Sequence, residues 1–73
     1  MSGLAQAGSR ECVAALERAG FQVVRQKGSH IVMHRDVPFA QTVVPGRKVI
    51  GKGLLRSILN QTGLSPDAFL KLL

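Results

Sequence analysis

Residues 21–35 read FQVVRQKGSHIVMHR. Two runs rich in β-branched residues are separated here by only two residues, Gly28 and Ser29. A glycine in the first position of a two-residue loop is typical of a type II′ hairpin turn. The stretch therefore predicts an antiparallel hairpin in which Lys27 lies opposite His30.

This register assigns side chains to the two faces of the hairpin, because successive strand residues point to opposite sides. It pairs Arg25 with Val32 and Val24 with Met33. The basic face carries Arg25, Lys27, His30 and His34, and the apolar face carries Val24, Ile31 and Met33. We expect helices to cover the apolar face. Phe21, Val23 and Val32 then fall on the basic face, where they could meet a protein partner; a β-bulge would change this assignment, because a one-residue slip exchanges the faces.

The segment before the hairpin predicts a helix. Ser9 is the expected N-cap, with Glu11 in the first turn. Gly20 is the expected left-handed residue after the helix, which would make Leu16 and Phe21 the apolar pair of a Schellman motif.

The segment after the hairpin predicts one more strand and two helices. Residues 40–44 (AQTVV) are the expected strand. The first of the two helices is expected to begin near Leu54 and to end at Gly63. Ser65 as N-cap and Pro66 at the first helical position start a last short helix. The order α-β-β-β-α(-α) indicates an α+β fold, a three-stranded antiparallel sheet with helices on one face.

Composition limits the chain to one small domain. It has 73 residues, which we divide into a flexible segment, 1–8, and a single domain, 9–73. Its one cysteine, Cys12, indicates a reducing, cytoplasmic setting and excludes a disulfide within the chain. No apolar run is long enough for a membrane span. We expect no cofactor, and no four-ligand metal site, because the one cysteine, two histidines and four carboxylates are spread along the chain.

The charge indicates an anionic partner. The net charge is +6, and seven of the ten lysines and arginines lie between Arg25 and Arg56. Such a field attracts nucleic acid or an acidic protein. The glycine-rich loop 46–53, with Arg47, Lys48 and Lys52, is either a phosphate-binding loop or a solvated connector.

His30 is the strongest candidate for chemistry, because imidazole can accept or donate a proton near neutral pH. A sheet-surface histidine without a role is the alternative. Ser29 beside it does not form a catalytic pair, since adjacent strand residues point to opposite faces.

Several short motifs together resemble the HicA toxin family. They are LERAGF at 16–21, RQKGSH at 25–30, Val44-Pro45, GLLRSIL at 53–59 and TGL at 62–64. The resemblance implies a fold like a double-stranded-RNA-binding domain and the toxin of a type II toxin–antitoxin pair. It also implies a metal-independent endoribonuclease that cleaves mRNA, with His30 as the essential histidine, and a cognate HicB-like antitoxin that blocks this site.

The resemblance and the basic face together predict the site. His30 is the general acid/base, and the residues expected to contact RNA or its phosphates are Arg25, Lys27, Ser29, Arg47, Lys48 and Lys52. Two departures from the family pattern are Met33, where many relatives have an aromatic residue, and Arg47, where many have a histidine. The first predicts weak base stacking. A non-catalytic RNA-binding module, and a protein that only binds an antitoxin, are the alternatives.

Overall fold

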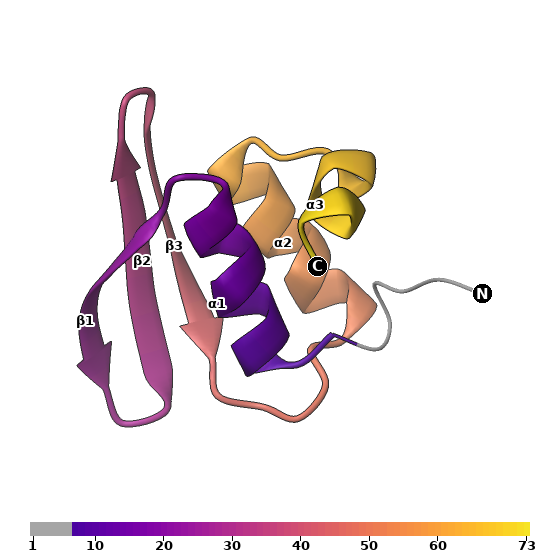
Figure 1. Ribbon diagram of the computed structural model, residues 1–73. Coiled ribbons are helices and arrows are strands. Elements are labelled where there is room, and N and C mark those ends of the chain that lie inside the picture. The colour runs from indigo at the N-terminus through magenta and orange to yellow at the C-terminus, as the bar shows by residue number, and fades with distance from the viewer. Residues whose placement is uncertain (1–6) are drawn as a thin grey trace.

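The computed structural model describes residues 7–73, which form three helices and three strands. The elements are α1 (Ser9–Arg18), β1 (Gln22–Lys27), β2 (His30–Asp36), β3 (Phe39–Pro45), α2 (Lys52–Thr62) and α3 (Pro66–Leu72). The strands form one antiparallel sheet in the order β1-β2-β3 (Figure 1). The predicted α+β class and element order are confirmed. The likeness to a double-stranded-RNA-binding domain stays a prediction.

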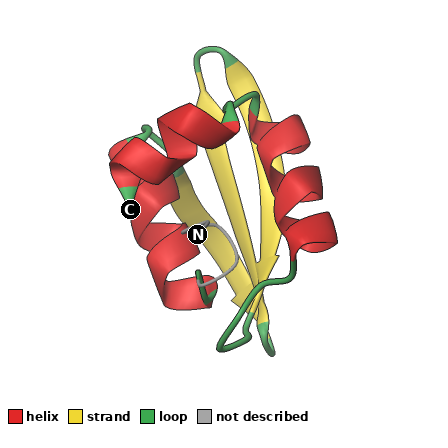
Figure 2. Ribbon diagram, turned by 90° about the vertical axis from the view of Figure 1, so that its right-hand side faces the viewer, coloured by secondary structure: helices red, strands yellow, loops and turns green. Residues whose placement is uncertain are grey.

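All three helices lie on one side of the sheet (Figures 1 and 2). Helices α1 and α2 contact β3, and α3 packs on α1. The core fills the space between helices and sheet, and its buried residues are Cys12, Ala15, Leu16, Phe21, Met33, Val44, Ile50, Leu55, Ile58, Leu59 and Phe69. Every residue of β1 is exposed, so this strand extends beyond the helical cover. No helix in residues 7–73 has the length and apolar character needed to cross a membrane.

The hairpin turn forms as predicted. Gly28 has a φ of 60°, and Lys27 pairs with His30. The predicted pairing of Arg25 with Val32 is also confirmed. Further along, the prediction is wrong: Val23, not Val24, pairs with Met33, because the register shifts between Val23 and Arg25. Val24 is therefore the extra residue of a β-bulge and is 46% exposed instead of lying in the core.

The C-terminus of α1 is a Schellman motif, as predicted. Gly20 has a φ of 96°, and its N–H donates to the Glu17 carbonyl at 3.0 Å. The N–H of Phe21 donates to the Leu16 carbonyl at 2.9 Å. Phe21 is only 2% exposed, so its predicted place on the basic face, and with it a role in an exposed interface, is wrong. The Arg35 guanidinium lies 4.6 Å from the centre of its ring.

The predicted N-cap of α1 is wrong by one residue. Ser9 is the first helical residue and Gly8 is the N-cap, with its N–H donating to Glu11 Oε1 at 3.0 Å. The backbone here is also bonded to the loop before α2. Ser9 N–H donates to the Arg47 carbonyl at 2.9 Å, and Ile50 N–H donates to the Ala7 carbonyl at 2.7 Å. The flexible segment predicted for residues 1–8 lies mainly outside the described residues, but Ala7 and Gly8 are buried.

The ends of the other helices follow their sequence signals. Gly63 has a φ of 77°, and its N–H donates to the Leu59 carbonyl at 2.9 Å, which ends α2. The Ser65 hydroxyl accepts from the Ala68 N–H at 3.1 Å, and Pro66 is the first residue of α3. Glycine in the left-handed region and serine at an N-cap both satisfy backbone groups that the helix leaves free.

Candidate functional site

His30 is the first residue of β2 and lies at the end of the sheet. It is exposed, and it pairs with Lys27 on β1 and with Pro45 on β3. Residues directly opposite each other in an antiparallel pair share a face, with their Cβ atoms about 4.5–5.5 Å apart. Lys27, His30 and Pro45 therefore form a row across the sheet, with the imidazole between an ammonium group and the start of the loop to α2.

The loop after β3 is held close to the hairpin turn. Gly46 N–H donates to the Ser29 carbonyl at 2.5 Å. A Cβ at Gly46 would lie 3.1 Å from that carbonyl oxygen and 3.3 Å from the Ser29 Cβ. Because the two backbones approach so closely, Arg47, the next residue, lies in the surroundings of His30. Ser29 thus contributes to the site through its backbone.

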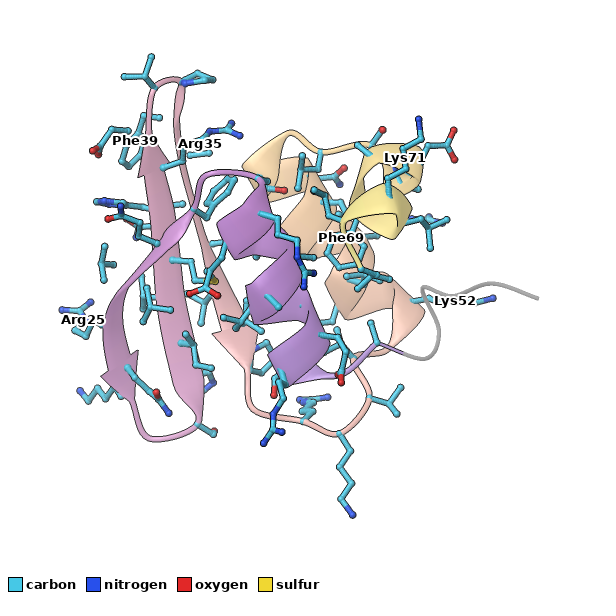
Figure 3. All side chains as sticks on the ribbon, in the orientation of Figure 1. Arg25, Arg35, Phe39, Lys52, Phe69 and Lys71 are labelled. Atoms are coloured by element: carbon cyan, nitrogen blue, oxygen red, sulfur yellow. The ribbon has the colours of Figure 1, made fainter. Side chains whose placement is uncertain are left out.

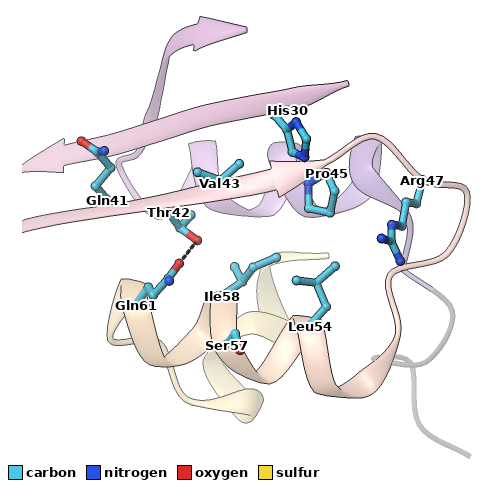
Figure 4. A pocket seen from close by; sticks show the side chains of 10 residues that line it. All are labelled: His30, Gln41, Thr42, Val43, Pro45, Arg47, Leu54, Ser57, Ile58 and Gln61. Atoms are coloured by element: carbon cyan, nitrogen blue, oxygen red, sulfur yellow. Dashed lines mark hydrogen bonds between the residues drawn. The ribbon is translucent and has the colours of Figure 1, made fainter. Parts of the chain in front are cut away.

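A pocket of about 480 Å³ lies beside His30, between β3 and α2 (Figure 4). His30, Pro45 and Arg47 are at one end of it. Val43 from β3 and Leu54 and Ile58 from α2 supply apolar walls. At the other end lie Gln41, Thr42 and Gln61, and Ser57 of α2 lies between the two ends. The pocket is therefore a partly apolar hollow with the imidazole of His30 and the guanidinium of Arg47 at one end.

The other predicted cations are spread over the molecule. Arg25 is exposed on β1, two residues from Lys27 and on the same face. Lys48 and Arg47 line a second hollow at the start of α1. Lys52 lines a third hollow, between α2 and the segment that leads into α3, and Figure 3 shows Lys52 and Arg25 at opposite sides of the molecule. The structure thus brings Lys27, Ser29 and Arg47 to His30 and places Lys52 away from it.

Two other arginines have structural contacts. Arg35 donates to the Pro38 carbonyl at 3.1 Å and to the Thr62 carbonyl at 3.4 Å. Arg18 donates to the Leu72 carbonyl at 2.5 Å. The bonds to Thr62 and to Leu72 each connect parts of the chain that are far apart in the sequence, so these two arginines have a structural role that needs no ligand.

His34 and Cys12 are set apart from the pocket. His34 Nε2 lies 3.5 Å from Asp36 Oδ1, and the His34 and Phe39 rings meet edge to face with their centroids 6.1 Å apart. Burial raises the pKa of the Cys12 thiol to about 11, so it stays protonated at neutral pH. Among residues 7–73, no group of three or more histidines, cysteines and carboxylates is placed to hold a metal ion.

A family model described as HicA toxin of bacterial toxin-antitoxin matches residues 9–64. The chain belongs to this family. No curated protein and no solved structure matched it. As a HicA toxin it is one member of a toxin–antitoxin pair, so it has a cognate antitoxin as partner.

Met33, one of the two departures from the family pattern, does not lie on the exposed face of the sheet. Met33 is fully buried beneath the sheet. A side chain at this position of the HicA toxin therefore packs in the core, and the prediction that Met33 weakens stacking of bases on the exposed face is wrong. Arg47, the second departure, does lie at the pocket, where it supplies a fixed positive charge.

The far end of the pocket contains two residues that no sequence motif indicated, Thr42 and Gln61. The Thr42 hydroxyl donates to Gln61 Oε1 at 2.6 Å, across the gap between β3 and α2. One signal was present in the sequence: Thr42 alternates with Ala40 and Val44 on the covered face of β3, where a polar side chain needs a partner. Gln61, three residues after Ile58 on α2, is that partner.

Proposed function

We propose that this HicA toxin is a metal-independent endoribonuclease that cleaves mRNA and thereby stops translation, with His30 as its general acid/base. The observation that carries the proposal is the placement of an exposed histidine between Lys27 and Arg47 at the mouth of a pocket. Family membership supports the toxin role. The net charge of +6 supports a polyanionic substrate.

The proposed reaction uses the RNA's own nucleophile. His30, in its neutral form, takes the proton of a ribose 2′-hydroxyl, and the 2′-oxygen forms a bond to the adjacent phosphorus. The bond from phosphorus to the 5′-oxygen breaks, which leaves a 2′,3′-cyclic phosphate on one fragment. The departing 5′-oxygen takes a proton, for which the Lys27 ammonium, across the strand pair from His30, is one available donor.

The charge that develops on the phosphorane oxygens needs nearby donors. Lys27 and Arg47 flank His30, and Arg47 can present two parallel N–H groups to phosphate oxygens. Loss of one such donor costs about 10²–10³ in rate at comparable oxyanion sites. Arg25 and Lys48, further from His30, would hold neighbouring phosphates, which gives binding a steep dependence on salt.

The test compares the two histidines of the chain. A long single-stranded RNA is incubated in excess EDTA with the wild type, with His30→Ala and with His34→Ala. The expected result is cleavage by the wild type and by His34→Ala and none by His30→Ala, with 2′,3′-cyclic phosphate ends on the products. Circular dichroism and RNA binding at low salt should be the same for all three proteins, because His30 is exposed and outside the core.

Three results would contradict the proposal in different ways. Cleavage by His30→Ala would remove the histidine from the mechanism. Intact RNA with the wild type, together with salt-sensitive binding, would identify an RNA-binding module without nuclease activity. Dependence of cleavage on added Mg²⁺ would show that the reaction is not metal-independent.

A further inference from the structure

The pocket beside His30 extends well beyond the atoms that a proton transfer needs. Thr42 is three residues from Pro45, so the far end of the pocket lies about 10 Å along β3 from the row that contains His30. The walls between the two ends are apolar: Val43, Leu54 and Ile58. A site that only cleaves the sugar–phosphate backbone would not need a hollow of this length with apolar walls.

We propose that this hollow holds one RNA base next to the cleaved phosphodiester, and that Gln61, oriented by Thr42, selects that base. The proposal rests on the proposed function, because it assumes that RNA is bound at His30. It adds that the site recognises one base of the RNA, and that Gln61 is the residue that recognises this base.

Size and surface favour a base as the occupant. A volume of about 480 Å³ is within the range of pockets for small organic ligands, which combine apolar walls with a few polar groups. Proteins that read single-stranded RNA take an unstacked base into such a hollow and hydrogen-bond its edge. Arg47 at the mouth supplies the charge that a phosphate next to that base would need.

The hydrogen bond between Thr42 and Gln61 fixes what the pocket can recognise. Thr42 is 2% exposed, so its hydroxyl has little access to water, and it donates to Gln61 Oε1. The carboxamide oxygen is thereby engaged, and the two N–H groups of Nε2 are left as donors. The bond is 2.6 Å long, and it holds the Gln61 amide with its oxygen toward Thr42.

A fixed donor distinguishes bases by their exocyclic groups. Guanine O6 and uracil O4 accept hydrogen bonds, whereas the amino groups of adenine and cytosine donate them. Gln61 should therefore favour guanine or uracil at one position beside the cut. The Ser57 hydroxyl, which also lines the pocket, can rotate to donate or to accept and so selects neither class.

The experiment maps cut positions on a long RNA of mixed sequence in EDTA, with the wild type and two variants at Gln61. The wild type should show a preference for guanine or uracil at one position flanking the cut. In Gln61→Leu, the ratio of cleavage at the preferred bases to cleavage at the other bases should fall about tenfold, which is the value of one good base contact. Gln61→Glu, which replaces the donor by an acceptor of the same shape, should shift the preference toward adenine or cytosine.

Two further variants test the role of the hydrogen bond and of position. Thr42→Val removes the hydroxyl that orients Gln61 and should weaken the preference without reversing it. Gln22→Leu changes an exposed glutamine on β1 outside the pocket and should leave the cut positions unchanged. Circular dichroism of each variant confirms that it is folded.

The outcomes separate this inference from the proposed function. Cleavage by both Gln61 variants at the positions that the wild type cuts would overturn the base pocket and leave the RNase assignment intact. Absence of cleavage by the wild type would overturn both. A switch of preference in Gln61→Glu alone, with Gln22→Leu unchanged, would establish the assignment.

Discussion

The segment just before α1 offers a sharp test of how the site is held, through the substitution Gly8→Ala. A Cβ built on Gly8 would lie 2.2 Å from the Lys48 carbonyl oxygen, a backbone atom. Gly8 has a φ of −101°, which alanine adopts without strain. The substitution therefore introduces a clash between two backbone segments, and the loop from Arg47 to Ile50 has to move away.

The cost can be worked out from the bonds that this movement breaks. Ser9 N–H to the Arg47 carbonyl, at 2.9 Å, and Ile50 N–H to the Ala7 carbonyl, at 2.7 Å, both span the clash. Each is worth about 1 kcal/mol, and partial exposure of Ile50 adds a similar amount, so we expect a loss of about 2–3 kcal/mol. For a domain of this size that lowers Tm by about 10–20 °C.

Thermal unfolding followed by circular dichroism measures the effect, with Gly53→Ala as the matched control. Gly53 lies in the first turn of α2 with no atom within 4 Å of an added Cβ, so alanine there should stabilise the protein by about 0.5 kcal/mol. A Tm of Gly8→Ala within about 2 °C of the wild type would refute the reasoning. It would mean that residue 8 belongs to a flexible segment, as the sequence suggested. If the chain is the RNase that we propose, Gly8→Ala should also cleave RNA more slowly, because Arg47 moves with the loop.

Two further predictions concern single groups. Burial raises the pKa of Cys12 from 9.0 to about 11, so the folded state holds the proton more tightly than the unfolded state. The stability that this contributes, roughly 2–3 kcal/mol, is complete below about pH 9 and is lost as pH rises toward 11. Urea unfolding should show this loss in the wild type and a smaller one in Cys12→Ala; parallel curves would contradict it. Ser65→Ala removes the hydroxyl that accepts from Ala68 N–H and should cost about 1 kcal/mol in the same assay, and an unchanged unfolding midpoint would contradict the capping role.

Most of the fold could be predicted because its signals are local. Gly20, Gly28 and Gly63 each have a positive φ in the structure, and each ends a helix or forms a turn where the sequence predicted it. A left-handed backbone residue is a property of one position and its immediate neighbours. It can therefore be read without knowledge of the tertiary structure.

The bulge in β1 could also have been predicted from the sequence. Phe21 had to be buried as the apolar residue of the Schellman motif, whereas Arg25 had to face solvent beside Lys27. In a regular strand, residues four apart point to the same face, so both conditions cannot hold. One extra residue between them resolves the conflict, and Val24 is that residue. Burial of Phe21 and exposure of Arg25 together therefore predict a bulge between them, although neither requirement does so alone.

The site was only half predictable, for a physical reason. His30 and Lys27 are neighbours across a two-residue turn, so local rules bring them together. Thr42 and Gln61 meet only because α2 lies along β3, and neither type of residue is diagnostic of a site by itself. Alternation on β3 does place Thr42 on the covered face, where an unpaired hydroxyl would be costly. That requirement calls for a polar partner on α2, and the partner it finds, Gln61, is the residue to which we assign the selection of an RNA base.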